Sequence, residues 1–95
     1  MNPVRDQELM FYTYIIRSIN SNRFYTGSTN DLRKRFNQHN MGKSTWTKRE
    51  KPWNLVYYEA CLNPEDARSR EKYLKSGMGK RYIKNRLKRF LSLTG

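Results

Sequence analysis

Hydrophobic positions alternate near the start of the chain and later recur at helical spacing. Residues 9–19 are rich in aromatic and β-branched side chains, a composition typical of a strand. Side chains point in turn to its two faces: Tyr12, Tyr14 and Ile16 to one, and Phe11, Thr13 and Ile15 to the other. Because both faces carry apolar bulk, we expect this strand to be central in its sheet.

Residues 20–22, Asn-Ser-Asn, have the chemistry of a tight turn. Residues 23–26 are then predicted to pair back as the second strand of a hairpin. We expect Gly27 to let the chain leave this strand at an angle that a side chain would resist.

A helix is predicted between residues 31 and 42, with several polar residues before it as candidate N-caps and Gly42 as a C-cap. Leu32 and Phe36 are four apart and are expected to face the core. Arg35 and His39 have the same spacing and share the adjacent stripe.

The second half predicts a third strand over residues 53–61 and two helices. Asn63 and Pro64 form a strong start for a helix that runs to about residue 75. A last helix is expected from near Lys80 to Leu91. The fold class is therefore α+β: one domain over residues 10–91, with a three-stranded, mostly antiparallel sheet flanked by helices in the order ββαβαα. Residues 1–9 are expected to form a flexible lead-in.

Composition indicates a polyanionic partner. Twenty Lys and Arg residues against eight Asp and Glu give a net charge of +12. A small domain this basic usually binds nucleic acid, with DNA expected and RNA left open; a merely soluble basic surface is the alternative. No apolar run approaches the roughly 18 residues of a membrane span, and no signal peptide is expected. The single cysteine, Cys61, favours a cytoplasmic chain and a buried structural thiol.

Several polar residues could serve phosphate chemistry, and each has a structural alternative. Glu71 could bind a metal ion or form a surface ion pair with its basic neighbours. The guanidinium of Arg35 could donate hydrogen bonds to two phosphate oxygens. Tyr14 and Tyr25 could be ordinary packed aromatic residues, and His39 could be structural.

The order of these residues resembles the GIY-YIG endonuclease family. Its two tripeptides correspond to Tyr12-Thr13-Tyr14 and Tyr25-Thr26-Gly27, with Tyr12 in place of the first glycine and threonine in place of both isoleucines. The following N-D-L-R-K-R, with Arg35 eight residues after Gly27, and the later R-E-K-Y-L-K strengthen the match. The resemblance covers about residues 10–87.

The resemblance implies a role for each residue. Glu71 would coordinate a single Mg²⁺ or Mn²⁺ ion, and Arg35 would neutralise the scissile phosphate. Tyr14 would help to deprotonate the attacking water, and Tyr25 would orient water or phosphate. His39 would assist proton transfer or phosphate binding, and Asn85 would have a positioning role.

The function expected from this resemblance is metal-dependent hydrolysis of phosphodiester bonds in DNA, directed by structure or damage rather than by sequence. A non-catalytic nucleic-acid-binding module is the alternative, favoured by Tyr12, and a subunit that needs a protein partner is a third. Trp46 could stack on bases or pack on the domain edge. The residues expected to bind nucleic acid are Arg33, Lys34, Lys43, Trp46, Lys48, Arg49, Lys51, Lys80 and Arg81.

Overall fold

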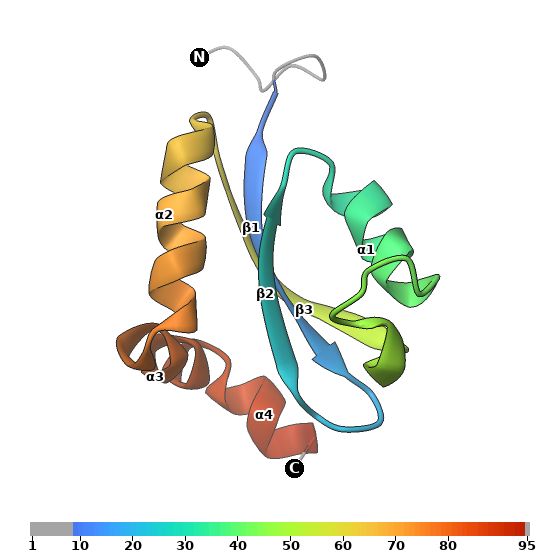
Figure 1. The fold of residues 1–95 in the computed structure, drawn as a ribbon. Coiled ribbons are helices and arrows are strands. Elements are labelled where there is room, and N and C mark those ends of the chain that lie inside the picture. The colour runs from blue at the N-terminus through green and yellow to red at the C-terminus, as the bar shows by residue number, and fades with distance from the viewer. Residues whose placement is uncertain (1–8, 95) are drawn as a thin grey trace, which may run out of the picture.

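The computed structural model describes residues 9–94 (Figure 1). The expected lead-in at residues 1–9 lies outside the described residues except for Leu9. The elements are β1 (Phe11–Ser18), β2 (Phe24–Thr29), α1 (Leu32–Asn40), a short 3₁₀ helix (Lys48–Glu50), β3 (Trp53–Cys61), α2 (Pro64–Lys75), α3 (Gly77–Arg86) and α4 (Lys88–Thr94).

The three strands form one antiparallel sheet in the order β2-β1-β3. The predicted α+β class and the central position of β1 are therefore confirmed. Tyr14 lies opposite Gly27 of β2 on one side and opposite Tyr58 of β3 on the other. Because β2 is an edge strand, side chains that cross it reach the rim of the sheet.

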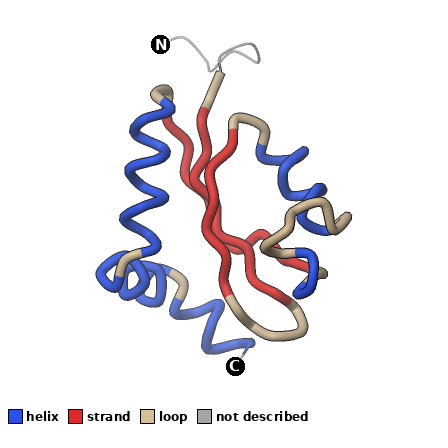
Figure 2. Tube along the Cα trace, viewed as in Figure 1, coloured by secondary structure: helices blue, strands red, loops and turns tan. Residues whose placement is uncertain are grey.

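Both faces of the sheet are covered, as the alternation in β1 predicts. Tyr14 and Ile16 pack with Trp53 on the face that α1 covers. Ile15 packs with Leu74 and Ile83, which belong to α2 and α3. Figures 1 and 2 show α2, α3 and α4 on one side of the sheet, with α1 and the loop before β3 on the other.

The predicted helix starts are present at α1 and α2. Asp31 caps α1 by accepting a hydrogen bond from the backbone N–H of Lys34 at 3.1 Å. Asn63 caps α2 in the same way through the N–H of Glu65 at 2.7 Å, with Pro64 as the first helical residue. Acceptors at these positions satisfy N–H groups that have no partner inside the helix.

The last predicted helix differs from the observed structure. It begins at Gly77 rather than near Lys80 and is divided into α3 and α4. Ser76 explains the early start, because its hydroxyl ends α2 by bonding to the carbonyl of Tyr73 and then accepts a hydrogen bond from the N–H of Gly79 at 3.2 Å. One residue thus serves as the C-cap of α2 and the N-cap of α3.

Two further expectations were wrong. Gly27 does not mark the end of the second strand but lies buried inside β2, which continues to Thr29. Cys61 is only half-buried, and its sulfur lies 3.3 Å from the carbonyl oxygen of Asn63. None of the helices in the described part of the chain is long and apolar enough to cross a lipid bilayer.

Candidate active site

A buried chain of hydrogen bonds joins β1, α1 and the loop before β3. The Tyr14 hydroxyl lies 2.7 Å from His39 Nε2, and His39 Nδ1 lies 2.7 Å from Thr47 Oγ1. The exposed fraction of His39 and Thr47 is 0%, and that of Tyr14 is 1%. The loop that carries Thr47 is fixed in turn by Trp53, whose indole N–H donates to the carbonyl of Thr47 at 3.0 Å.

Gly27 makes room for this arrangement. A Cβ at this position would lie 2.5 Å from the Tyr14 hydroxyl oxygen, so any side chain would collide with the phenol. The Tyr14 side chain therefore lies across β2 at the one residue of that strand that leaves space for it, and its hydroxyl reaches the edge of the sheet.

The Tyr14 phenol and the His39 imidazole are both neutral at physiological pH, and burial reinforces this. Burial raises the pKa of Tyr14 to about 12, an effect that the nearby Arg35 guanidinium opposes. Burial, reinforced by the charge of Arg35, lowers the pKa of His39 to about 4. A neutral imidazole carries one N–H, so one of its two hydroxyl neighbours donates to the ring and the other accepts from it.

Arg35 and Tyr25 complete the side of the cluster that faces α1. Arg35 donates to Gln38 Oε1 at 3.2 Å and is half-buried. The Tyr25 ring meets the His39 ring edge-on, with centroids 5.2 Å apart, and the ring of Trp53 at 6.5 Å. The Tyr25 hydroxyl has no hydrogen-bond partner among residues 9–94.

Glu71 reaches the same sheet edge from α2, on the opposite face. Its Oε1 accepts from the Ser28 hydroxyl at 2.7 Å, and its Oε2 accepts from Lys75 Nζ at 2.8 Å. The side chain is 22% exposed, and its charge raises the pKa of Tyr14, which places the two groups within electrostatic reach. Glu71 therefore does not point to open solvent away from Arg35.

The ion pairing of Glu71 differs from the one that its sequence neighbours indicated. Lys75, one turn later, is its partner. Arg70 instead forms two hydrogen bonds with Glu59 of β3, at 2.9 and 2.7 Å, and this contact lowers the pKa of Glu59. In α2, Arg70 thus forms an ion pair with the sheet, and Lys75 forms one with the candidate site.

Five of the six residues with expected catalytic roles lie together at the edge of β2: Tyr14, Tyr25, Arg35, His39 and Glu71. Asn85 is not among them. It is exposed on α3, two positions after the buried Ile83, and so lies on the side of that helix turned away from the sheet. Tyr12, which replaces the first glycine of the family signature, packs edge-on against Tyr58 with centroids 6.0 Å apart.

The residues expected to bind nucleic acid lie on both sides of this edge. Trp46 is 83% exposed and does not pack on the domain. Together with Arg23, Lys48 and Arg49 it lines a groove of about 560 Å³ that also includes Tyr25. All nine are exposed, on three parts of the chain: Arg33 and Lys34 on α1; Lys43, Trp46, Lys48, Arg49 and Lys51 in the loop before β3; Lys80 and Arg81 on α3.

Glu71 could serve as the one protein ligand of a hard divalent cation. No group of three or more His, Cys, Asp or Glu residues that could hold a metal ion is found within residues 9–94. A site here would thus consist of one carboxylate with water and substrate oxygens, which suits Mg²⁺. Both oxygens of Glu71 have further lone pairs, and its bond to the half-exposed Lys75 is weak enough to yield.

Three polar residues of the site were missed by the sequence patterns: Ser28, Thr47 and Lys75. Lys75 could have been found, because it follows Glu71 at the i, i+4 spacing of a helical ion pair. Ser28 and Thr47 belong to no such spacing pattern. Their contacts with Glu71 and His39 depend on tertiary structure.

Comparison with known proteins identifies the family of this chain. The chain is 42% identical over 67 residues to the UPF0213 protein CPE1444 of Clostridium perfringens, covering 70% of this chain and 71% of that protein. It is 36% identical over 85 residues to a UPF0213 protein of Pediococcus pentosaceus, covering 88% of each. The solution structure of the UPF0213 protein BH0048 from Bacillus halodurans is 29% identical, with a TM-score of 0.49, over 79% of this chain and 82% of that one. The sequence model of the GIY-YIG catalytic domain matches residues 10–88, and the chain therefore belongs to the GIY-YIG family.

Proposed function

We propose that this protein is an endonuclease that hydrolyses phosphodiester bonds in DNA, with one divalent cation bound through Glu71. The observation that carries the proposal is the meeting of a buried Tyr14-His39 pair with Arg35 and Glu71 at one edge of the sheet. Phosphodiester hydrolysis needs a proton acceptor for the attacking water and positive charge on the phosphate. These residue types supply both.

Tyr14 and His39 accept the proton of the attacking water. A phenol whose pKa is about 12 is a poor base alone, but it can accept a proton from water while passing its own to His39 Nε2 at 2.7 Å. The pKa of His39 is about 4 in the free protein, and the negative charge of a bound phosphate would raise it. Thr47 holds the ring by its other nitrogen.

Arg35 and a cation at Glu71 would stabilise the negative charge on the phosphate. A guanidinium binds two phosphate oxygens in the ground state and in the transition state alike. The cation at Glu71 would stabilise charge on the phosphate and on the leaving oxygen. Tyr25, whose hydroxyl has no partner among the described residues, is available to orient water or phosphate.

Glu71→Ala tests the proposal. Purified protein is incubated with branched, nicked and single-stranded DNA in Mg²⁺ or Mn²⁺, beside Glu71→Ala and the matched control Glu65→Ala, which removes an exposed carboxylate from the first turn of the same helix. We expect Glu71→Ala to abolish cleavage and to leave metal-free DNA binding unchanged or slightly tighter, because an anion is lost. Glu65→Ala should cleave normally.

Arg35→Ala should behave differently, since it should weaken both binding and cleavage. Unaltered cleavage by a folded Glu71→Ala variant would contradict the proposal and place the chemistry elsewhere. Tight, salt-sensitive binding with no cleavage under any condition would instead favour a nucleic-acid-binding module that retains the fold.

A further inference from the structure

A second groove lies beside the candidate active site, on the face of the sheet that α2, α3 and α4 cover. It has a volume of about 460 Å³, within the range of pockets that bind small organic groups. Lys75 lines this groove and also donates to Glu71, and Tyr25 lines it while packing on His39. The groove therefore borders the site, and neither the proton transfer nor the metal binding proposed above uses its apolar floor.

The floor and the rim of the groove have different chemistry. Ile15, Leu74, Ile83 and Leu91 provide an aliphatic floor. Phe24 adds an aromatic ring that remains 44% exposed. The Arg17 guanidinium lies 5.8 Å from the centroid of this ring and helps to hold it in place.

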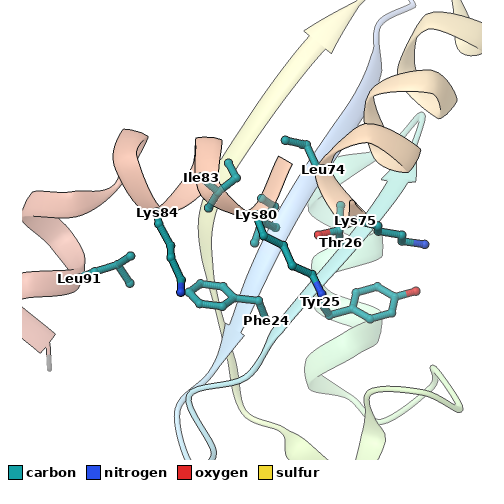
Figure 3. A pocket seen from close by; sticks show the side chains of 10 residues that line it. Phe24, Tyr25, Thr26, Leu74, Lys75, Lys80, Ile83, Lys84 and Leu91 are labelled. Carbon is teal, nitrogen blue, oxygen red and sulfur yellow. The ribbon is translucent and has the colours of Figure 1, made fainter. Parts of the chain in front are cut away.

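Three lysines surround this apolar surface. Lys75, Lys80 and Lys84 all line the groove, and no carboxylate of residues 9–94 does. Figure 3 shows Lys80 and Lys84 extending from α3 toward the strand that carries Phe24. Neither of these two lysines pairs with an acid within residues 9–94, so their charges face the groove without compensation.

We propose that this groove binds one unpaired nucleotide of the DNA strand, adjacent to the phosphate that is cleaved. The base would stack on Phe24 over the aliphatic floor, and its phosphates would contact the lysines. An aromatic platform with cations beside it is the usual site for an unstacked base. A paired base has its faces covered by its neighbours in the duplex and cannot enter unless it leaves the stack.

The inference rests on the proposed function and specifies its substrate class. The preferred DNA would have single-stranded nucleotides next to the cut, as in a flap, an overhang or a gap. The +12 charge of the chain and the position of the groove beside Glu71 favour a nucleic acid over the other occupant of similar chemistry, an acidic segment of a partner protein.

The test measures binding without metal, so that it does not depend on cleavage. Hairpin DNA with a blunt end is compared with the same hairpin carrying a short overhang, and with an overhang whose sugars lack bases. A fluorescent 2-aminopurine in the overhang reports stacking by loss of emission. We expect the overhang with bases to bind on the order of tenfold more tightly than the abasic one, with its fluorescence quenched.

Phe24→Leu preserves an apolar side chain but removes the aromatic face. It should reduce the affinity for the overhang DNA to that of the abasic DNA and leave blunt-hairpin binding unchanged. Tyr58→Leu, which alters an exposed aromatic residue on β3, is the matched control and should have no effect. Lys80→Gln and Lys84→Gln should each weaken overhang binding several-fold, whereas Lys88→Gln, outside the groove, should not.

Equal binding of the base-containing and abasic overhangs by the wild-type chain overturns the proposal and leaves the groove to another occupant, such as an acidic segment of a partner protein. An unchanged preference in folded Phe24→Leu also overturns it. The two proposals fail separately. A protein that cleaves DNA but shows no base preference retains the endonuclease function, and one that binds the unpaired base without cleaving retains only the groove.

Discussion

His39 links the folding of the domain to pH more directly than any other side chain of the site. Its pKa is lowered from 6.5 to about 4 by burial and by the charge of Arg35. Between these values the unfolded chain binds a proton that the folded chain does not. The free energy of unfolding should therefore rise as the pH increases from about 4 to 6.5, and the stabilisation is lost as the pH falls through this window. The full effect is about 3 kcal/mol.

His39→Gln provides the comparison. The variant retains a polar side chain that can bond to Tyr14 or Thr47 but has no titratable group. Urea unfolding at a series of pH values should give a flatter curve for the variant over this window. The carboxylates contribute the same slope to both proteins, including Glu59, whose pKa is lowered by Arg70. Parallel curves for the two proteins would contradict the assignment of the pH dependence to His39.

At the scale of elements, the pairing of β1 with β2 makes the site possible. Tyr14 crosses β2 at Gly27, where a Cβ would lie 2.5 Å from the phenol oxygen. Gly27→Ala must therefore displace Tyr14 from His39. We expect it to destabilise the fold by about 1–3 kcal/mol through overpacking. It should also reduce cleavage on the order of 100-fold, because the reacting group moves by an ångström or more.

Gly77→Ala is the matched control for this change. A Cβ at Gly77, in the first turn of α3, would meet nothing within 4 Å, so the variant should be as stable as the wild type or slightly more stable. Thermal unfolding and a cleavage assay on both variants check the prediction. A Gly27→Ala variant with wild-type stability and activity would show that Tyr14 does not need its observed position.

Some elements could be predicted from the sequence because their determinants are local. Asn63 and Pro64 specify the start of α2 within three residues, and the alternation in β1 indicates burial on both faces. The early start of the last helix at Gly77 was not predicted, since Ser76 acts through hydrogen bonds to two helices at once. The role of Gly27 was also missed, because the side chain that requires it belongs to the neighbouring strand.

In the candidate site, too, the residues could be predicted from the sequence but their contacts could not. Arg35, His39 and Glu71 were identified because their spacing resembles that of a known family. The contacts that hold them were not predicted, since they join residues far apart in the chain: Tyr14 and His39 are separated by 25 positions, and Ser28 and Glu71 by 43. Helical and strand periodicity carries no information about such pairs.

For the molecule as a whole, charge and architecture are the basis for expecting a DNA substrate along the edge of β2. The basic loop before β3 lies with α1 on one side of the sheet, and α3 with Lys80 and Arg81 lies on the other (Figure 1). The cluster around Tyr14 and Glu71 lies between them. A strand of DNA following this edge would meet positive charge before and after the site.

The salt dependence of DNA binding tests this arrangement. If about four to six phosphates are contacted, the logarithm of the association constant should fall with the logarithm of salt concentration with a slope of about −4 to −5. Lys48→Ala should weaken binding modestly, reduce this slope by about 0.9 and leave the turnover of bound substrate intact, because the lysine replaces one counterion and has no part in the chemistry. Lys72→Ala removes an equal charge from an exposed position on α2 and should leave the slope unchanged. Equal effects of the two variants would mean that net charge alone, rather than an ordered path along β2, determines the affinity. An association constant of the wild type that does not change with salt concentration would exclude nucleic acid as the partner.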